Sequence, residues 1–107
     1  MNRTFNYLGD ELRKLRKNKR LLLRQVAATA DIDTAFLSKV ERGERTIGKE
    51  HISKLAMVYN TEPGSLIKLW LCDKILQITK QDSEGPHAIE MALKELKSDS
   101  LIGNIKL

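Results

Sequence analysis

The sequence has one cysteine, few aromatic side chains (5%) and no apolar run long enough to span a membrane. A single cysteine excludes an internal disulfide and a zinc site built from several cysteines, and the apolar surroundings of Cys72 favour a buried thiol over a reactive one. The first twelve residues, MNRTFNYLGDEL, lack the apolar core of a signal peptide. We therefore expect a cytoplasmic protein that binds no structural metal and no cofactor.

Runs of alternating β-branched residues are also missing, whereas Leu, Lys, Ala and Glu, which favour helices, are abundant. A chain of 107 residues with 41% hydrophobic residues has the size of one domain and can bury a modest core. The composition predicts an all-α protein.

Positive charge is concentrated in the first third of the chain. Residues 1–30 carry eight basic and two acidic side chains, residues 31–72 carry six of each, and residues 73–107 carry five basic and six acidic. The basic side chains of the first segment are Arg3, Arg13, Lys14, Arg16, Lys17, Lys19, Arg20 and Arg24. Such a segment attracts nucleic acid without selecting a sequence, although a basic helix face can also be simply solvated.

Apolar residues at helical spacing predict six helices. In the first, Leu8, Leu12 and Leu15 mark one buried stripe, and the other face is basic; residues 21–23 then form a short apolar link. The expected helices cover residues 6–19, 24–30, 34–42, 49–59, 65–78 and 87–97.

The third helix has the clearest boundaries. Asp33 is a good N-cap, because its carboxylate can accept from amides at the helix start. Ile32 and Leu37 have the spacing of a hydrophobic staple, and Gly43 stands where a left-handed residue ends a helix. At the end of the fourth helix, Asn60 suits the same conformation.

The fifth helix has more apolar surface than one contact needs. Leu66, Leu69 and Trp70 form one patch and Ile67, Leu71, Ile75 and Ile78 a second, so we expect one patch to close the core and the other to meet a second partner. Residues 81–86 are predicted to be a linker. The sixth helix is too short to be stable alone in water and must dock on its own chain or on another subunit. The tail, residues 98–107, has no clear periodicity.

Three stretches carry a family resemblance: LGDELRKLRKNK, RQVAATADIDTAFLSKVERGER and HISKLAMVYN. With their order and spacing, residues 8–66 resemble the Cro/phage-repressor-like, or XRE-type, helix-turn-helix transcriptional regulators. The resemblance implies a compact five-helix repressor-like DNA-binding bundle, here with an additional C-terminal helix. It places the helix-turn-helix at about residues 23–42 within a domain of residues 1–80, and leaves residues 81–107 as linker, helix and tail for dimerisation or docking.

The resemblance also implies which residues meet DNA. Four outward residues of the third helix would meet base edges, since hydroxyl and ammonium groups bind base acceptors and a methyl group can pack on thymine. Others, around the ends of the two helices, would hold phosphates and set the register. The candidate base readers are Thr34, Ala35, Ser38 and Lys39, and the candidate phosphate contacts are Arg24, Gln25, Arg42, Arg45 and Lys49.

Family members commonly pair the residues equivalent to Arg16 and Glu41 inside the domain, because a half-buried guanidinium needs a carboxylate; direct DNA contact by Arg16 is the alternative. Leu23 departs from the glutamine frequent at its position, so a phosphate contact is lost there or supplied by a neighbour. Phe36 is expected to pack at the edge of the third helix, and contact with thymine is its alternative.

Three kinds of function compete. An enzyme is disfavoured, because His51 and His87 lie on separate helices and no nucleophile and base, phosphate loop or carboxylate pair stands out. A protein-interaction module, such as the antitoxin of a toxin–antitoxin pair, would use the surplus apolar surface of the last two helices. We favour a homodimeric regulator that binds a palindromic operator, as a repressor or an operon controller. Its partners would be double-stranded DNA and a second copy of the chain, which would bind through the fifth helix and residues 81–97.

Overall fold

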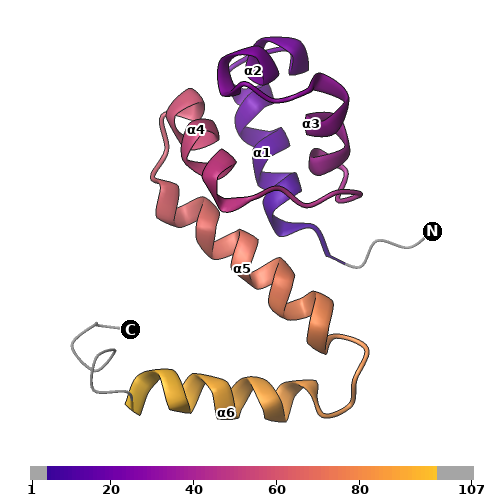
Figure 1. Cartoon of the computed structure of the whole chain (residues 1–107), viewed down its shortest axis with the longest axis vertical. Coiled ribbons are helices and arrows are strands. Elements are labelled where there is room, and N and C mark those ends of the chain that lie inside the picture. Colours follow the sequence, from indigo (N-terminus) through magenta and orange to yellow (C-terminus); the bar gives the residue numbers. More distant parts are fainter. Residues whose placement is uncertain (1–4, 99–107) are drawn as a thin grey trace. The chain divides into compact units, whose positions relative to one another are not determined.

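The computed structural model describes residues 5–98, and this part of the chain consists of helices joined by short turns, without strands (Figure 1). The predicted all-α class is confirmed. The helices are α1 (Tyr7–Asn18), α2 (Leu23–Ala30), α3 (Thr34–Glu41), α4 (Lys49–Tyr59), α5 (Pro63–Thr79) and α6 (Gly85–Ser98). Arg3 and the tail beyond residue 98 lie outside the described residues.

Several predicted boundaries need correction. Helix α2 begins at Leu23, so the apolar link is one residue shorter, and α3 ends at Glu41 with Arg42 as its C-cap. Helix α5 begins at Pro63, a residue suited to a first turn because it has no amide hydrogen that would need a partner. Helix α6 begins at Gly85, inside the predicted linker, which is therefore only a turn.

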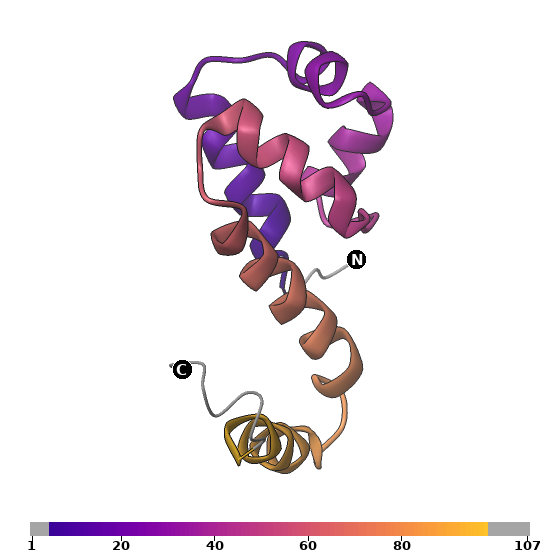
Figure 2. The same ribbon diagram turned by 60° about the vertical axis from the view of Figure 1, so that its left-hand side comes forward.

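The chain divides into two compact units between Asp73 and Lys74. In the first, α2 packs against α3 and α4, and α1 packs against α3; Figures 1 and 2 show these four helices clustered together. In the stripe predicted for α1, Leu8 and Leu12 are buried and Leu15 is only partly buried. The core consists of Leu8, Leu12, Val26, Ala27, Ala30, Leu37, Val40, Ile47, Ile52, Leu55, Ala56, Tyr59 and Leu66.

The beginning of α1 is fixed by residues distant in sequence. The carboxylate of Asp73, on α5, accepts hydrogen bonds from the backbone amides of Tyr7 and Leu8, both at 3.0 Å. Asn6 donates from its side-chain amide to the carbonyl of Glu41 at 2.8 Å. A carboxylate at a helix N-terminus satisfies exposed amides and favours the helix dipole. Helix α1 is thus held at its start by α5 and by the end of α3.

The ion pair implied for Arg16 and Glu41 is present. Nε and Nη2 of Arg16 donate to the two carboxylate oxygens at 2.8 and 3.0 Å, and Nη1 donates to the carbonyl of Leu21 at 3.0 Å. The side chains are only 12% and 4% exposed. The hydrogen bond to Glu41 raises the pKa of Arg16 above its ordinary value. This pair joins α1 to α3 and leaves Arg16 turned toward the protein.

Tyr59 is a buried phenol whose hydroxyl has no hydrogen-bond partner among the described residues. Burial, and then the charge of Glu41, raise the pKa of Tyr59 above its ordinary 10.0. The folded protein therefore holds this proton more tightly than the unfolded chain, and the associated stability is complete below pH 10.0 and is lost as pH rises above it.

We expect Tyr59→Phe to reduce this alkaline loss of stability. In the wild type, the tyrosine lowers the free energy of unfolding by about 1.4 kcal/mol at pH 11. This is the free energy of one pH unit, the interval by which pH 11 exceeds the ordinary pKa of 10.0. Urea unfolding of both proteins between pH 8 and pH 11 measures the difference. The Tyr59→Phe protein should lose less stability over this range, and parallel losses in the two proteins would contradict the assignment.

The surplus apolar surface predicted for α5 is present, with one change. Leu66 is buried, and Leu69, Trp70 and also Ile67 pack partly buried against the core, so Ile67 belongs with the first patch. The indole of Trp70 donates to the carbonyl of Ile47 at 2.8 Å. The remaining residues of the second patch, Leu71, Ile75 and Ile78, are exposed by 48%, 47% and 80%.

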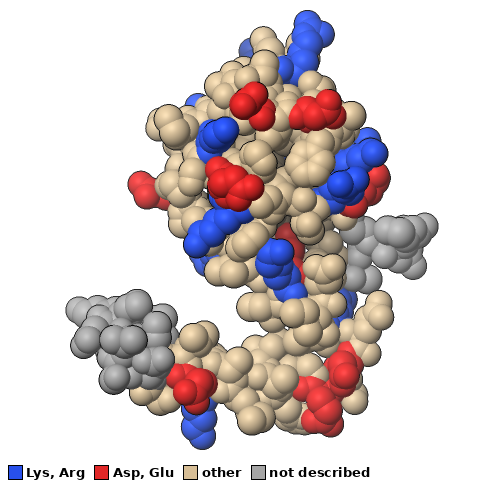
Figure 3. Space-filling view, viewed as in Figure 1, with Lys and Arg blue, Asp and Glu red and all other residues tan. Residues whose placement is uncertain are grey.

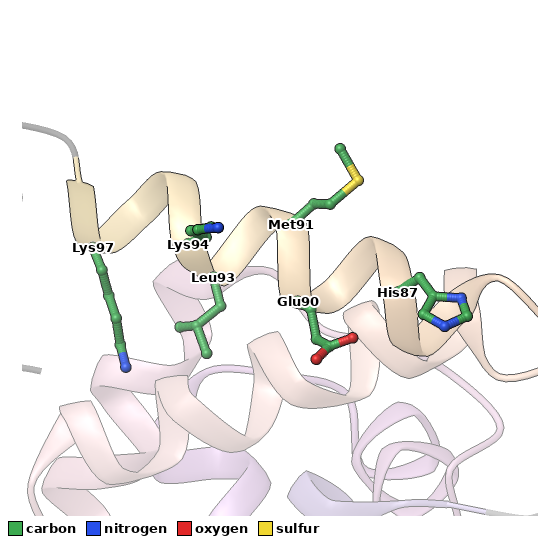
Figure 4. A pocket seen from close by; sticks show the side chains of 6 residues that line it. All are labelled: His87, Glu90, Met91, Leu93, Lys94 and Lys97. Carbon is green, nitrogen blue, oxygen red and sulfur yellow. The ribbon is translucent and has the colours of Figure 1, made fainter.

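In the second unit, the turn before α6 is so tight that a Cβ on Gly85 would collide with the backbone of Thr79. Helix α6 also carries exposed apolar side chains, namely Ile89, Met91, Leu93 and Leu96. Figure 4 shows an open depression lined from this one helix by His87, Glu90, Met91, Leu93, Lys94 and Lys97. A depression with walls from a single helix gives no enclosed site.

Candidate nucleic-acid interface

Helices α2 and α3 form a compact pair around a tight turn at residues 31–33. Asp31 is left-handed, with φ 59°, and the amide of Ile32 donates to the carbonyl of Ala27 at 2.9 Å. Buried small side chains, Ala27 and Ala30, let α2 approach its neighbours closely. Two short helices joined in this way have the arrangement that presents the second one to the major groove.

The N-terminus of α3 is capped as predicted, since the carboxylate of Asp33 accepts from the amide of Phe36 at 3.0 Å. Leu37 and Val40 face the core, so the residues on the opposite side of α3 face outward. We call that side, Thr34, Ala35, Ser38 and Lys39, the recognition face. Thr34, Ala35 and Lys39 are exposed and Ser38 is half-buried. The structure thus brings the four candidate base readers together on one accessible surface.

The candidate phosphate contacts flank this surface and are all exposed. Arg24 and Gln25 lie in the first turn of α2, where Gln25 also accepts from the amide of Leu22 at 2.7 Å through its side-chain oxygen. Arg45 lies in the loop after α3, and Lys49 begins α4. Amide and cationic groups at helix starts are suited to phosphate oxygens.

Arg45 is held by an aromatic ring. Its guanidinium carbon lies 5.6 Å from the centroid of Phe36, which itself packs partly buried against the core. A cation above a ring is attracted by the negative face of the ring. Phe36 therefore packs at the edge of α3, as expected, and holds the Arg45 side chain close to the recognition helix.

Leu23 cannot make the phosphate contact of the glutamine that is frequent at its position in the family. Its side chain is half-buried and packs against the core at the start of α2. The next residues, Arg24 and Gln25, are the polar groups that α2 offers at this end.

Arg42 has a neighbour that the sequence analysis missed. Its Nε donates to Oε2 of Glu44 at 2.9 Å, Nη2 approaches Oε1 at 3.3 Å, and Nη1 donates to Oγ of Ser38 at 3.0 Å. A candidate phosphate contact is therefore paired with a carboxylate and linked to a candidate base reader. Separations of two residues seldom bring side chains together on a helix, and the pair forms because the chain turns at Gly43.

The helix-turn-helix family model matches residues 12–66, which include the pair of helices, α4 and the start of α5. The chain belongs to the XRE-type helix-turn-helix family. The family is one of DNA-binding transcriptional regulators, and this chain is such a regulator. No curated protein matches the chain.

Two solved structures resemble this XRE-type protein. The restriction-modification controller protein C.AhdI from Aeromonas hydrophila is 34% identical, with a TM-score of 0.55 over 57% of this chain and 92% of the other. The clp gene regulator ClgR from Corynebacterium glutamicum is 22% identical, with a TM-score of 0.56 over 86% of this chain and 88% of the other. At that identity, ClgR supports the fold alone.

Family and neighbours are regulators rather than enzymes. His51 lies on α4 and His87 on α6, where its Nδ1 is 3.1 Å from a carboxylate oxygen of Glu84. Among residues 5–98, no group of three or more His, Cys, Asp or Glu side chains is arranged to hold a metal ion. Within the same range, no helix has both the length and the apolar character needed to cross a membrane.

Proposed function

We propose that this XRE-type regulator binds one specific duplex sequence by placing α3 in the major groove. The observation that carries the proposal is the recognition face. Its residues, Thr34, Ala35, Ser38 and Lys39, lie together on the outward side of α3, whose N-terminus is capped by Asp33. Lys39 would donate to guanine acceptors, the two hydroxyls would donate or accept, and the methyl group of Ala35 would contact thymine.

Phosphate contacts from both ends of the pair would fix the register of α3 in the groove. At the start of α2 these are Arg24 and Gln25, and beyond α3 they are Arg45 and Lys49, with Arg42 at the junction. Because Phe36 holds Arg45 and the Leu22 amide holds Gln25, these two side chains lose less freedom on binding than mobile ones would.

We further propose that the active species is a homodimer on a palindromic operator, which it controls as a repressor or operon controller. The exposed apolar residues of α5 and α6 supply a surface that one chain leaves uncovered. Helix α5 and residues 81–97 then form the dimer contact, and residues 1–80 hold the DNA-binding domain, whose compact unit ends at Asp73. The 34% identity to C.AhdI, which is named a restriction-modification controller, favours an operon controller among the possible roles.

Selection of bound sequences from a random duplex library tests the proposed function. We expect the full chain to enrich a motif with two-fold related halves about one helical turn apart, because a two-fold dimer presents two α3 helices at that spacing. A single unpaired half-site would contradict the dimer. If no motif is enriched, the apolar surfaces of α5 and α6 favour the alternative of a protein-interaction module.

A further inference from the structure

Glu44 is held in a fixed place at the end of α3. The amide of Gly43 donates to the carbonyl of Val40 at 3.0 Å, and the amide of Glu44 donates to the carbonyl of Lys39 at 2.9 Å. Gly43 is left-handed, with φ 78°. These two bonds and that conformation make a Schellman motif, which ends the helix and fixes the direction of the following residue.

The motif sets the carboxylate of Glu44 against a cation of the proposed DNA-binding surface. Arg42 lies four residues after Ser38, one turn further along the same side of α3, and its Nη1 is 3.0 Å from the Ser38 hydroxyl. Its Nε lies 2.9 Å from Glu44, and the two side chains are 51% and 49% exposed. On the side of the first unit where α3 and its following loop lie, Figure 3 likewise shows acidic side chains beside basic ones.

A phosphate that approaches Arg42 must therefore displace the carboxylate or lie beside it as a like charge. Exposed ion pairs are weak, so the pair can open, but every opening costs part of the attraction that Arg42 would offer. Contacts to phosphate are the main source of non-specific DNA affinity, whereas base contacts carry the sequence information.

We propose that Glu44 limits the affinity of this surface for DNA phosphates by pairing with Arg42. The inference rests on the proposed placement of α3 in the major groove. Base contacts of Thr34, Ala35 and Lys39 do not involve Glu44, so its carboxylate lowers the phosphate contribution to binding and leaves the base contribution unchanged.

The test compares Glu44→Gln with wild type on a duplex of random sequence over a range of salt concentrations. We expect Glu44→Gln to bind about fivefold more tightly at low salt, since 1 kcal/mol corresponds to about that factor. The plot of log affinity against log salt should become steeper by about 0.9, the contribution of one additional phosphate contact. The melting temperature should stay the same, because the residue is exposed.

Glu62→Gln is the matched control, because it removes the same charge from an exposed residue outside the helix pair. An Arg42→Ala background provides the second control, in which Glu44→Gln should change neither affinity nor slope. The proposal is overturned if Glu44→Gln behaves as Glu62→Gln does, or if its effect persists without Arg42. Failure of the wild type to bind any duplex would instead overturn the DNA-binding role itself.

Discussion

Arg16→Ala is expected to destabilise the protein by about 3–5 kcal/mol, the usual cost of removing one partner from a buried ion pair. The variant leaves the carboxylate of Glu41, only 4% exposed, without the donors Nε and Nη2 of Arg16. It also leaves the carbonyl of Leu21 without the donor Nη1. For a domain of this size, that loss lowers the melting temperature by more than about 10 °C. Thermal and urea unfolding measure it.

Arg13→Ala serves as the control, because Arg13 is an exposed arginine of the same helix, and it should melt close to wild type. An Arg16→Ala protein that melts like wild type but binds DNA poorly would show that Arg16 is a DNA contact instead of a structural cation. Because the pKa of Arg16 is raised, its contribution to stability is complete below the ordinary pKa of an arginine and is lost only as pH rises from there through the raised value, so the pair gives no pH dependence near neutrality.

Leu93→Glu is expected to convert the proposed dimer into single chains and to weaken operator binding by about 100-fold or more. Leu93 lies among the exposed apolar residues of α6, and a charge there would have to lose water in a dimer interface built on this surface. Two linked recognition helices bind more tightly than one because the second contact becomes intramolecular.

Light scattering at micromolar concentration and a titration of operator DNA measure the two effects together. Ala88→Glu, at an exposed position of α6 outside the depression, is a control for the added acidic side chain. Wild type that scatters as a single chain, or Leu93→Glu that remains dimeric, would contradict a dimer built on α6. The apolar surface would then be available to a different protein.

Local sequence patterns were sufficient to predict most of the helices, and the family resemblance supplied the candidate residues of the proposed interface. The Asp33 cap, the left-handed Gly43 and Asn60, and the buried stripes of α1 to α4 depend on residues within a few positions of each other. The residues of the recognition face were carried over from the family resemblance, and spacing along α3 explains why they share one side.

Contacts between distant segments could not be predicted in this way. Asp73 caps α1 across 65 residues, and Trp70 binds the loop at Ile47, because the fold brings α5 beside the start of α1 and the end of that loop. The pairing of Glu44 with Arg42 depends on the turn at Gly43, which reverses the chain just after the helix. The surplus patch of α5 was recognised from its spacing, but the inclusion of Ile67 in the core required the packing of the whole unit.

The central claim, that the recognition face selects a sequence, is tested most directly by one ratio measured at fixed salt. This is the dissociation constant for random duplex divided by that for the selected duplex, in wild type and in Lys39→Ala. We predict a wild-type ratio of at least about 1,000, and a drop of about tenfold or more in Lys39→Ala, since one good base contact contributes about 1–3 kcal/mol of discrimination. A wild-type ratio near one, or an unchanged ratio in Lys39→Ala, would contradict sequence recognition through this face of α3.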